Sequence, residues 1–261
     1  MDGATGGADD SSHRPRSESK APSGGDHAAE QAPSELARRL LEQVRREHPT
    51  ESTLQAIGRL DRFELDELRS DRRTALSFWL NVYNAAAQLL LERRPELFES
   101  RWRFFRTTAI TVAGVELSLD DIEHGILRDK RSKYGLGYLP RLVSTGFGAE
   151  HRLDVDPRVH FALNCGAASC PAILAYDPES VDRTLDAATE SYLQQTVTYD
   201  TNRNRVRVPR VCLWFIGDFG GRSGLRTFLR DHGQIPPESA PTIRFKGYDW
   251  SELPRKFADG T

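Results

Sequence analysis

Cysteine is scarce in this sequence, with three residues in 261. So few cysteines, and an odd number of them, argue against a disulfide framework and favour a reducing compartment. No stretch approaches eighteen apolar residues without a charge, which argues against a membrane-spanning helix. The first residues also lack the basic and then apolar pattern of a secretory signal. We therefore expect a cytoplasmic protein.

Charge of one sign is also lacking, since the net charge is only −2 although 28% of the residues are charged. This balance predicts no general attraction to nucleic acid or to an anionic membrane surface. Residues 1–32 contain no large apolar side chain after Met1, too little to offset the entropy of ordering them, and are predicted to form a disordered tail. Amphipathic spacing predicts short helices over residues 33–69, followed by one domain over about residues 70–255.

A long apolar segment, residues 72–92, is predicted to form a buried helix at the centre of the domain. Its polar residues are spaced by four, three and four, which places them on one stripe: Ser77, Asn81, Asn84 and Gln88. Buried polar side chains must be hydrogen-bonded. Either they satisfy the backbone of a neighbouring loop, or Asn81 or Asn84 orients an imidazole as the third member of a nucleophilic site.

The remaining pattern predicts an α+β fold, helix-rich in its first half, with a small sheet. Hairpins are expected over residues 109–117 and 197–208, and an edge strand is expected over residues 242–250. Ser118 and Asp121 resemble a capping box that opens a helix over residues 119–131. The short apolar run of residues 159–163 is interpreted as the central strand. A papain-like or transglutaminase-like layout would suit this arrangement by analogy.

The chemistry-bearing residues concentrate in residues 156–171, where His160, Cys165 and Cys170 lie within eleven positions. Cys165 is expected at a strand end, in a turn of small residues. Pro171 is typical of a first helical position, so Cys170 is expected near a helix start, where the pKa of a thiol is lowered.

Four separated stretches carry a family resemblance: FWLNVYNA at 78–85, LDDIEHGILR at 119–128, DPRVHFALNCG at 156–166 followed by SCP at 169–171, and YDW at 248–250. Together they resemble domain of unknown function family 547, over about residues 70–250. The resemblance implies a domain found in microbes and plants, with no settled activity. It also marks His124, His160, Cys165 and Cys170 as positions within the family's motifs.

Three hypotheses follow for this cluster. In the first, Cys165 or Cys170 is a nucleophile for acyl transfer or amide hydrolysis, and His160 or His124 is its base. Asn81, Asn84 or an aspartate orients that base, and backbone N–H groups of residues 166–168 form an oxyanion hole. Its substrate would be a small molecule or a peptide, and it needs no cofactor. In the second, the same two cysteines and two histidines hold a structural zinc ion. In the third, they are inert core residues of a module that binds a partner protein.

Overall fold

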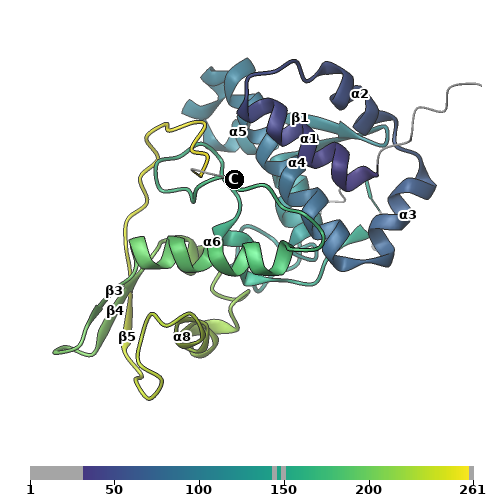
Figure 1. Cartoon of the computed structure of the whole chain (residues 1–261). Helices are drawn as coiled ribbons and strands as arrows, with labels where there is room; N and C mark the ends of the chain where they lie inside the picture. Colours follow the sequence, from purple (N-terminus) through teal and green to yellow (C-terminus); the bar gives the residue numbers. More distant parts are fainter. Residues whose placement is uncertain (1–31, 143–145, 148–150, 259–261) are drawn as a thin grey trace, which may run out of the picture. The chain divides into compact units, whose positions relative to one another are not determined.

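The chain is organised around one central helix, α4 (Arg72–Arg93), in a computed structural model that describes residues 32–142, 146–147 and 151–258 (Figure 1). The carboxylate of Asp71 caps this helix by accepting from the backbone nitrogens of Arg73 and Thr74. Every residue from Ala75 to Leu91 is buried, which confirms the predicted central helix. All but the last residue of the predicted tail lies outside the described residues.

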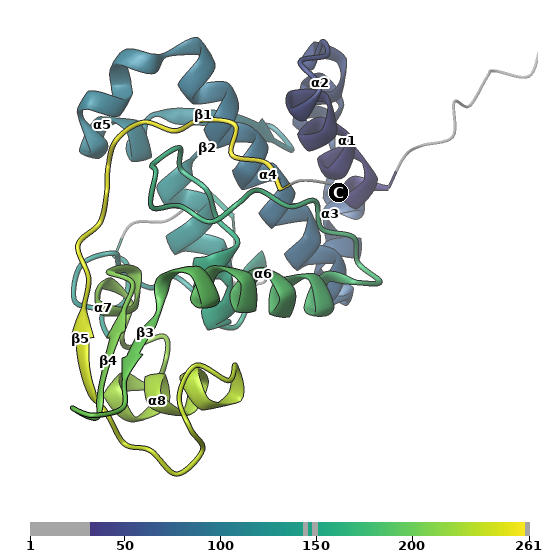
Figure 2. The same ribbon diagram turned by 60° about the vertical axis from the view of Figure 1, so that its left-hand side comes forward.

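The helical half of the domain surrounds α4. It comprises α1 (Pro33–Arg45), α2 (Glu51–Arg59), α3 (Arg62–Ser70), η1 (Pro95–Glu99), α5 (Arg101–Arg106) and a hairpin of β1 (Thr108–Val112) and β2 (Val115–Ser118). Figures 1 and 2 both show α1, α2 and α3 together on one side of α4. Leucines on one face of α1 and the apolar residues of α4 belong to a first hydrophobic cluster, which also contains Cys165 and Cys170.

A second hydrophobic cluster lies under a small sheet. The sheet has the order β3 (Thr198–Asp200), β4 (Arg205–Val208), β5 (Thr242–Phe245), with β3 antiparallel and β5 parallel to β4. Val206 and Ile243 pack there with residues of α7 (Val211–Trp214) and α8 (Gly221–Asp231). Helix α6 (Val181–Thr196) lies between the two halves in both views, and its residues enter both clusters. Both predicted hairpins are thus confirmed, and the predicted edge strand is confirmed over Thr242–Phe245, where it ends.

The predicted central strand at residues 159–163 is wrong. Residues Pro157–Phe161 form a short 3-10 helix, η4, which Asp156 opens by accepting from the backbone nitrogen of Arg158. Pro157 occupies its first turn, where proline is favoured, and Val159 and Phe161 are buried in different clusters. A short apolar run does not distinguish a strand from a buried helical turn, and here the cap and the proline favour the turn.

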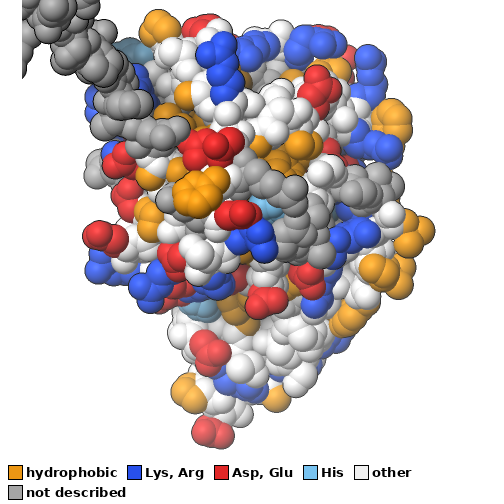
Figure 3. Space-filling model, turned by 90° about the vertical axis from the view of Figure 1, so that its right-hand side faces the viewer, with side chains coloured by type: hydrophobic (Ala, Val, Ile, Leu, Met, Phe, Trp, Pro, Cys, Tyr) orange, Lys and Arg blue, Asp and Glu red, His pale blue; other side chains and the backbone are white. Residues whose placement is uncertain are grey.

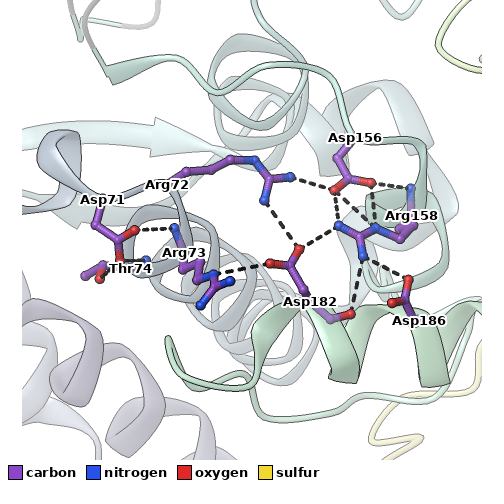
Figure 4. A network of polar contacts seen from close by, with 8 residues as sticks. All are labelled: Asp71, Arg72, Arg73, Thr74, Asp156, Arg158, Asp182 and Asp186. Atoms are coloured by element: carbon purple, nitrogen blue, oxygen red, sulfur yellow. Dashed lines mark hydrogen bonds and ion pairs between the residues drawn. The ribbon is translucent and has the colours of Figure 1, made fainter.

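An ionic network fixes the start of η4 to α4 and α6 (Figure 4). The Asp156 carboxylate lies 2.6 Å from both Arg72 and Arg158, and Arg158 also reaches Asp182 at 2.7 Å and Asp186 at 2.8 Å. Burial raises the pKa of Asp156, but the hydrogen bonds from Arg158 outweigh burial and lower it. The network therefore holds in place the turn that carries His160.

The helix predicted after Ser118 begins as expected, because Ser118 and Asp121 exchange the hydrogen bonds of a capping box. Its body, η2 (Asp121–Leu127), is a π-helical segment, a form often found at functional sites. It carries Glu123 and His124 and places both among buried residues.

The segment after β5 runs from the sheet to the helical half (Figure 2). Arg255 ends this path with bonds to the carbonyls of Val44 and Arg45 at the end of α1. None of the helices in the described part of the chain is both long and apolar enough to span a bilayer. On the face drawn in Figure 3, basic and acidic side chains lie interspersed, in keeping with the small net charge.

Candidate active site

A cavity of about 440 Å³ opens where the two hydrophobic clusters meet. His124, His160, Cys165 and Cys170, the four motif residues, all line it. They are joined there by the polar or charged side chains of Tyr83, Arg101, Asp120, Glu123, Lys133, Tyr134, Ser169, Tyr192 and Tyr248 and by the apolar side chains of Trp102, Phe105, Leu163, Pro171, Val211, Trp214, Phe215 and Trp250. The fold therefore brings together the histidines and cysteines that the sequence singles out.

The cysteines lie on a loop, residues 164–171, which we call the thiol loop. Asn164 shapes it, because its side chain donates to the carbonyl of Pro171 at 2.7 Å and accepts from the backbone nitrogen of Gly166 at 2.8 Å. Gly166 has a φ of +91°, and a Cβ there would lie 2.3 Å from a methyl carbon of Leu91. Glycine is thus required for the loop to approach α4 so closely.

The polar stripe of α4 holds the loops of the site. Asn81 bonds the backbone nitrogen and carbonyl of Tyr176, at 3.0 and 2.7 Å. Asn84 likewise bonds the carbonyl of Ala162 and the nitrogen of Asn164, at 3.0 and 2.9 Å. Of the two alternatives, bonding to loop backbone is the one found, and neither amide contacts an imidazole among the described residues. Asn84 positions the residues just before Cys165.

The two sulfur atoms face each other, with 3.1 Å between Cys165 Sγ and Cys170 Sγ. Cys170 Sγ also lies 3.3 Å from the backbone nitrogen of Cys165 and 3.3 Å from the hydroxyl of Tyr248. Since a thiolate accepts hydrogen bonds, these donors stabilise a negative charge on Cys170. Burial raises the pKa of Cys170, but the bonds from Cys165 and Tyr248 outweigh it and lower the pKa to about 6.

Cys165 is the member of the pair that keeps its proton. Its hydrogen bond to Cys170, and then burial, raise its pKa. The expected origin of an acidic thiol, a helix beginning at Pro171, is wrong, because the next helix, α6, begins at Val181. The acidity of Cys170 instead comes from the donors around its sulfur.

His160 is oriented by a carboxylate, with its Nε2 2.9 Å from Asp218 Oδ2. Burial lowers the pKa of His160. Burial raises the pKa of Asp218, but the hydrogen bonds from His160 and Arg128 outweigh burial and lower the pKa of Asp218. An ionised carboxylate only accepts, so Nε2 of the neutral imidazole carries the proton and Nδ1 keeps its lone pair. The ring also stacks on Phe215, with centroids 4.3 Å apart.

His124 has the same tautomer for a different reason. Arg128 Nη1 lies 2.8 Å from His124 Nδ1, and because a guanidinium only donates, Nδ1 accepts and Nε2 carries the proton. Burial and the charge of Arg128 lower the pKa of His124. Beside it, Glu123 accepts from the hydroxyl of Tyr83 at 3.2 Å, and burial raises the pKa of Glu123 to about 7.

Asp218 and Arg128 were not predicted as site residues. Asp218 lies in the apolar segment 212–219, and an acidic residue in such a run is the signal that points to it. Arg128 lies four residues after His124 and contacts its Nδ1 at 2.8 Å.

The zinc hypothesis finds no support in this geometry. Within residues 32–142, 146–147 and 151–258, no three His, Cys, Asp or Glu side chains are placed to hold a metal ion together. One nitrogen of each imidazole is already bonded, to Arg128 and to Asp218.

Two of the three amides expected to form an oxyanion hole are also engaged. The backbone nitrogen of Gly166 donates to Asn164 Oδ1, and that of Ala168 donates to the carbonyl of Ser251, both at 2.8 Å. The expected hole at residues 166–168 is therefore wrong for these two groups.

Tyr248→Phe is expected to raise the pKa of Cys170 by about 1, because it removes one donor to the thiolate. The measurement is the pH dependence of Cys170 alkylation by iodoacetamide, followed by mass spectrometry. Tyr199→Phe is the matched control, since its hydroxyl bonds Asn204 on the β3–β4 turn. Equal profiles for wild type and Tyr248→Phe would show that the hydroxyl does not stabilise the thiolate.

Comparison with known proteins finds one family. Residues 66–193 match the model of the family described as "Protein of unknown function, DUF547". No curated protein and no solved structure matches the chain. The matched residues include both histidines and both cysteines of the site, whereas Asp218 and Tyr248 lie beyond them. Residues 66–193 are therefore similar to the DUF547 family, in agreement with the resemblance of the sequence motifs.

Proposed function

We propose that this domain is a thiol-dependent enzyme that transfers an acyl group to an acceptor or hydrolyses an amide. The observation that carries the proposal is the hydrogen-bonded sulfur of Cys170, which shares a cavity with the carboxylate-oriented imidazole of His160. A positioned thiolate with an oriented base is the usual arrangement of nucleophilic catalysis.

In this proposal the Cys170 thiolate attacks the carbonyl carbon of the substrate. A C–S bond forms, and the carbonyl π electrons move to oxygen, giving a tetrahedral intermediate. The Nε2–H of His124 is the donor we assign to that oxygen, because the ring lines the cavity and Nε2 lies 3.6 Å from Asp120 Oδ1, beyond hydrogen-bond distance.

Collapse of the intermediate breaks the C–N bond, and the departing amine takes a proton. Because Cys170 is already ionised and His160 is neutral, the proton comes from another group. Glu123, with a pKa of about 7, is protonated in part at neutral pH and lines the same cavity.

The resulting thioester is then cleaved by water or by an acceptor amine or alcohol. His160 Nδ1 takes the proton of that nucleophile, and the Cys170 thiolate leaves. Aromatic side chains around the cavity, among them Trp102, Phe105, Trp214 and Trp250, suit an apolar or aromatic acyl group of a small molecule or peptide.

The test is hydrolysis of p-nitrophenyl esters and p-nitroanilides with short apolar acyl groups, together with intact-mass detection of the acyl-enzyme. Cys170→Ser is expected to lose at least about 1,000-fold in kcat/KM and to form no thioester. Cys212→Ser is the matched control, because Cys212 is buried in the second cluster away from the cavity, and it is expected to behave as wild type. Undiminished activity and acylation in Cys170→Ser would overturn the proposal.

The same proposal places the reaction in the cytoplasm, where free thiols persist. All three cysteines are free. A Cys170 thiolate requires such a reducing compartment to remain available for attack.

A second candidate function is binding of a partner protein. It is favoured by exposed apolar side chains near the cavity, where Tyr134 is 65% and Leu139 is 56% exposed. Exposed apolar groups close together in sequence are typical of interaction sites. If the domain only binds a partner protein, the double variant Tyr134→Ser and Leu139→Ser should lose that binding. Neither wild type nor any variant should then hydrolyse esters.

A further inference from the structure

We infer that Cys165 and Cys170 are a site of reversible oxidation, in which a small disulfide such as oxidised glutathione converts the pair into an intrachain disulfide. The inference goes beyond the proposed acyl transfer and does not depend on it. It rests on the placement of the two sulfurs and on the groups that surround them.

The first observation is proximity in a held loop. The sulfur atoms lie 3.1 Å apart, so a disulfide of about 2.05 Å needs an approach of only about 1 Å. The thiol loop is fixed by the C-terminal segment, through bonds from the backbone nitrogen of Ala168 to Ser251 at 2.8 Å and from Lys256 to the carbonyl of Cys170 at 2.7 Å. The reduced pair is therefore already close to the geometry of the bond.

The second observation is that the two thiols differ. Cys170 receives bonds from the Cys165 nitrogen and the Tyr248 hydroxyl, which favour its thiolate, whereas Cys165 lies in position to donate its S–H to Cys170. Both thiols line the cavity, where Cys165 is 7% and Cys170 is 2% exposed. One sulfur is thus suited to attack and its neighbour to resolve the product.

The chemistry balances in two steps. The Cys170 thiolate attacks one sulfur of glutathione disulfide, the S–S bond of the reagent breaks, and a glutathione thiolate leaves behind a mixed disulfide on Cys170. Cys165 then gives its proton to the departing thiolate and attacks Cys170 Sγ, which releases the second glutathione. The protein thiolate and thiol are oxidised by two electrons, and glutathione disulfide is reduced to one glutathione thiol, which carries the Cys165 proton, and one glutathione thiolate, which takes a proton from water.

The consequence is that oxidation removes the thiolate from the cavity. Tyr248 then loses the charged partner of its hydroxyl, and Cys170 Sγ is no longer a thiolate that can attack a carbonyl. Where the proposed acyl transfer holds, the disulfide would switch it off, and a dithiol would restore it.

The test treats the full chain with oxidised glutathione at pH 7 and reads intact mass and free thiols after denaturation. Wild type is expected to lose the mass of two hydrogen atoms and to fall from three free thiols to one, with both changes reversed by dithiothreitol. Peptide mapping should place the bond between Cys165 and Cys170, and Cys212→Ser should form the same bond.

Single variants separate the attack on glutathione disulfide by Cys170 from the resolution of the mixed disulfide by Cys165. Cys165→Ser is expected to stop at one glutathione attached to Cys170, and Cys170→Ser is expected to remain unmodified at residue 165. Cys165→Ala provides a second form of the first variant should the serine disturb folding. The inference is overturned if wild type accumulates the glutathione adduct as Cys165→Ser does, or does not react. These readouts use no acyl substrate, so they are independent of whether the protein is a hydrolase.

Discussion

Asp218→Ala is expected to lower the free energy of unfolding by about 3–5 kcal/mol, because it leaves a buried guanidinium without its carboxylate. Both side chains of the Arg128–Asp218 pair are 0% exposed, and Arg128 Nε lies 2.6 Å from Asp218 Oδ2. For a chain of this size the loss corresponds to a fall in Tm of about 6–20 °C. Guanidinium and thermal unfolding, followed by circular dichroism, measure both.

Asp177→Ala is the control for this prediction. Asp177 pairs with Arg38 at 3.2 Å, but the two side chains are 56% and 49% exposed, so its loss should cost less than about 1 kcal/mol. Combining Asp218→Ala with Arg128→Met should cost less than the sum of the two single changes, since no buried charge is then left unpaired. Equal effects of Asp218→Ala and Asp177→Ala would contradict a buried ion pair at the site.

Gly166→Ala is expected to have the second large effect, on both stability and thiol reactivity. A non-glycine residue at φ +91° is strained by about 1–3 kcal/mol, and its Cβ would lie 2.3 Å from Leu91 unless the loop shifts. A shifted loop moves the Cys165 nitrogen away from Cys170 Sγ, now 3.3 Å distant, and the pKa of Cys170 should rise. Chemical unfolding and the pH dependence of Cys170 alkylation give the two readouts.

Gly114→Ala separates backbone strain from the effect on the site. Gly114, in the β1–β2 turn, also has a positive φ, +74°, but a Cβ there meets no atom within 4 Å. It should lower stability by about 1 kcal/mol and leave the reactivity of Cys170 unchanged. If Gly166→Ala also leaves that reactivity unchanged, the close packing of the thiol loop on α4 does not maintain the acidic sulfur.

Elements with a long or repeated pattern were predictable from the sequence. Residues 72–92 form a buried helix because nearly all of them are apolar, and the polar stripe through Asn81 and Asn84 bonds loop backbone, as buried amides must. The glycine, asparagine and aspartate residues between β1 and β2 and between β3 and β4 predicted the two turns.

The error at residues 159–163 has a local cause. Five apolar or aromatic residues suit a buried strand as well as a buried turn. Asp156, Pro157 and the arginines that bind Asp156 stabilise the turn here. The arginine of α4 in this network, Arg72, is distant in sequence, so no local pattern contains it.

For the site, the sequence motifs supplied the reactive groups and Tyr248, but not Asp218 or the contacts that these two partners make. His160, Cys165 and Cys170 line one cavity, and their catalytic roles stay a prediction. Asp218, which orients His160, and Tyr248, which bonds Cys170, come from segments 58 and 78 residues further along the chain. Such contacts depend on tertiary packing, which periodicity and spacing do not encode.

The central claim is that Cys170 is a thiolate near neutral pH. Its most direct test is the rate of iodoacetamide alkylation at Cys170 in the native wild-type protein between pH 4 and pH 10, resolved by peptide mass spectrometry with Cys212 as the internal buried control. The account predicts a rate that rises with pH and is half-maximal near pH 6, since the thiolate forms as pH increases through the pKa. A half-maximal rate near pH 8.5, the value of an ordinary thiol, or protection of Cys170 at all pH values, would contradict it.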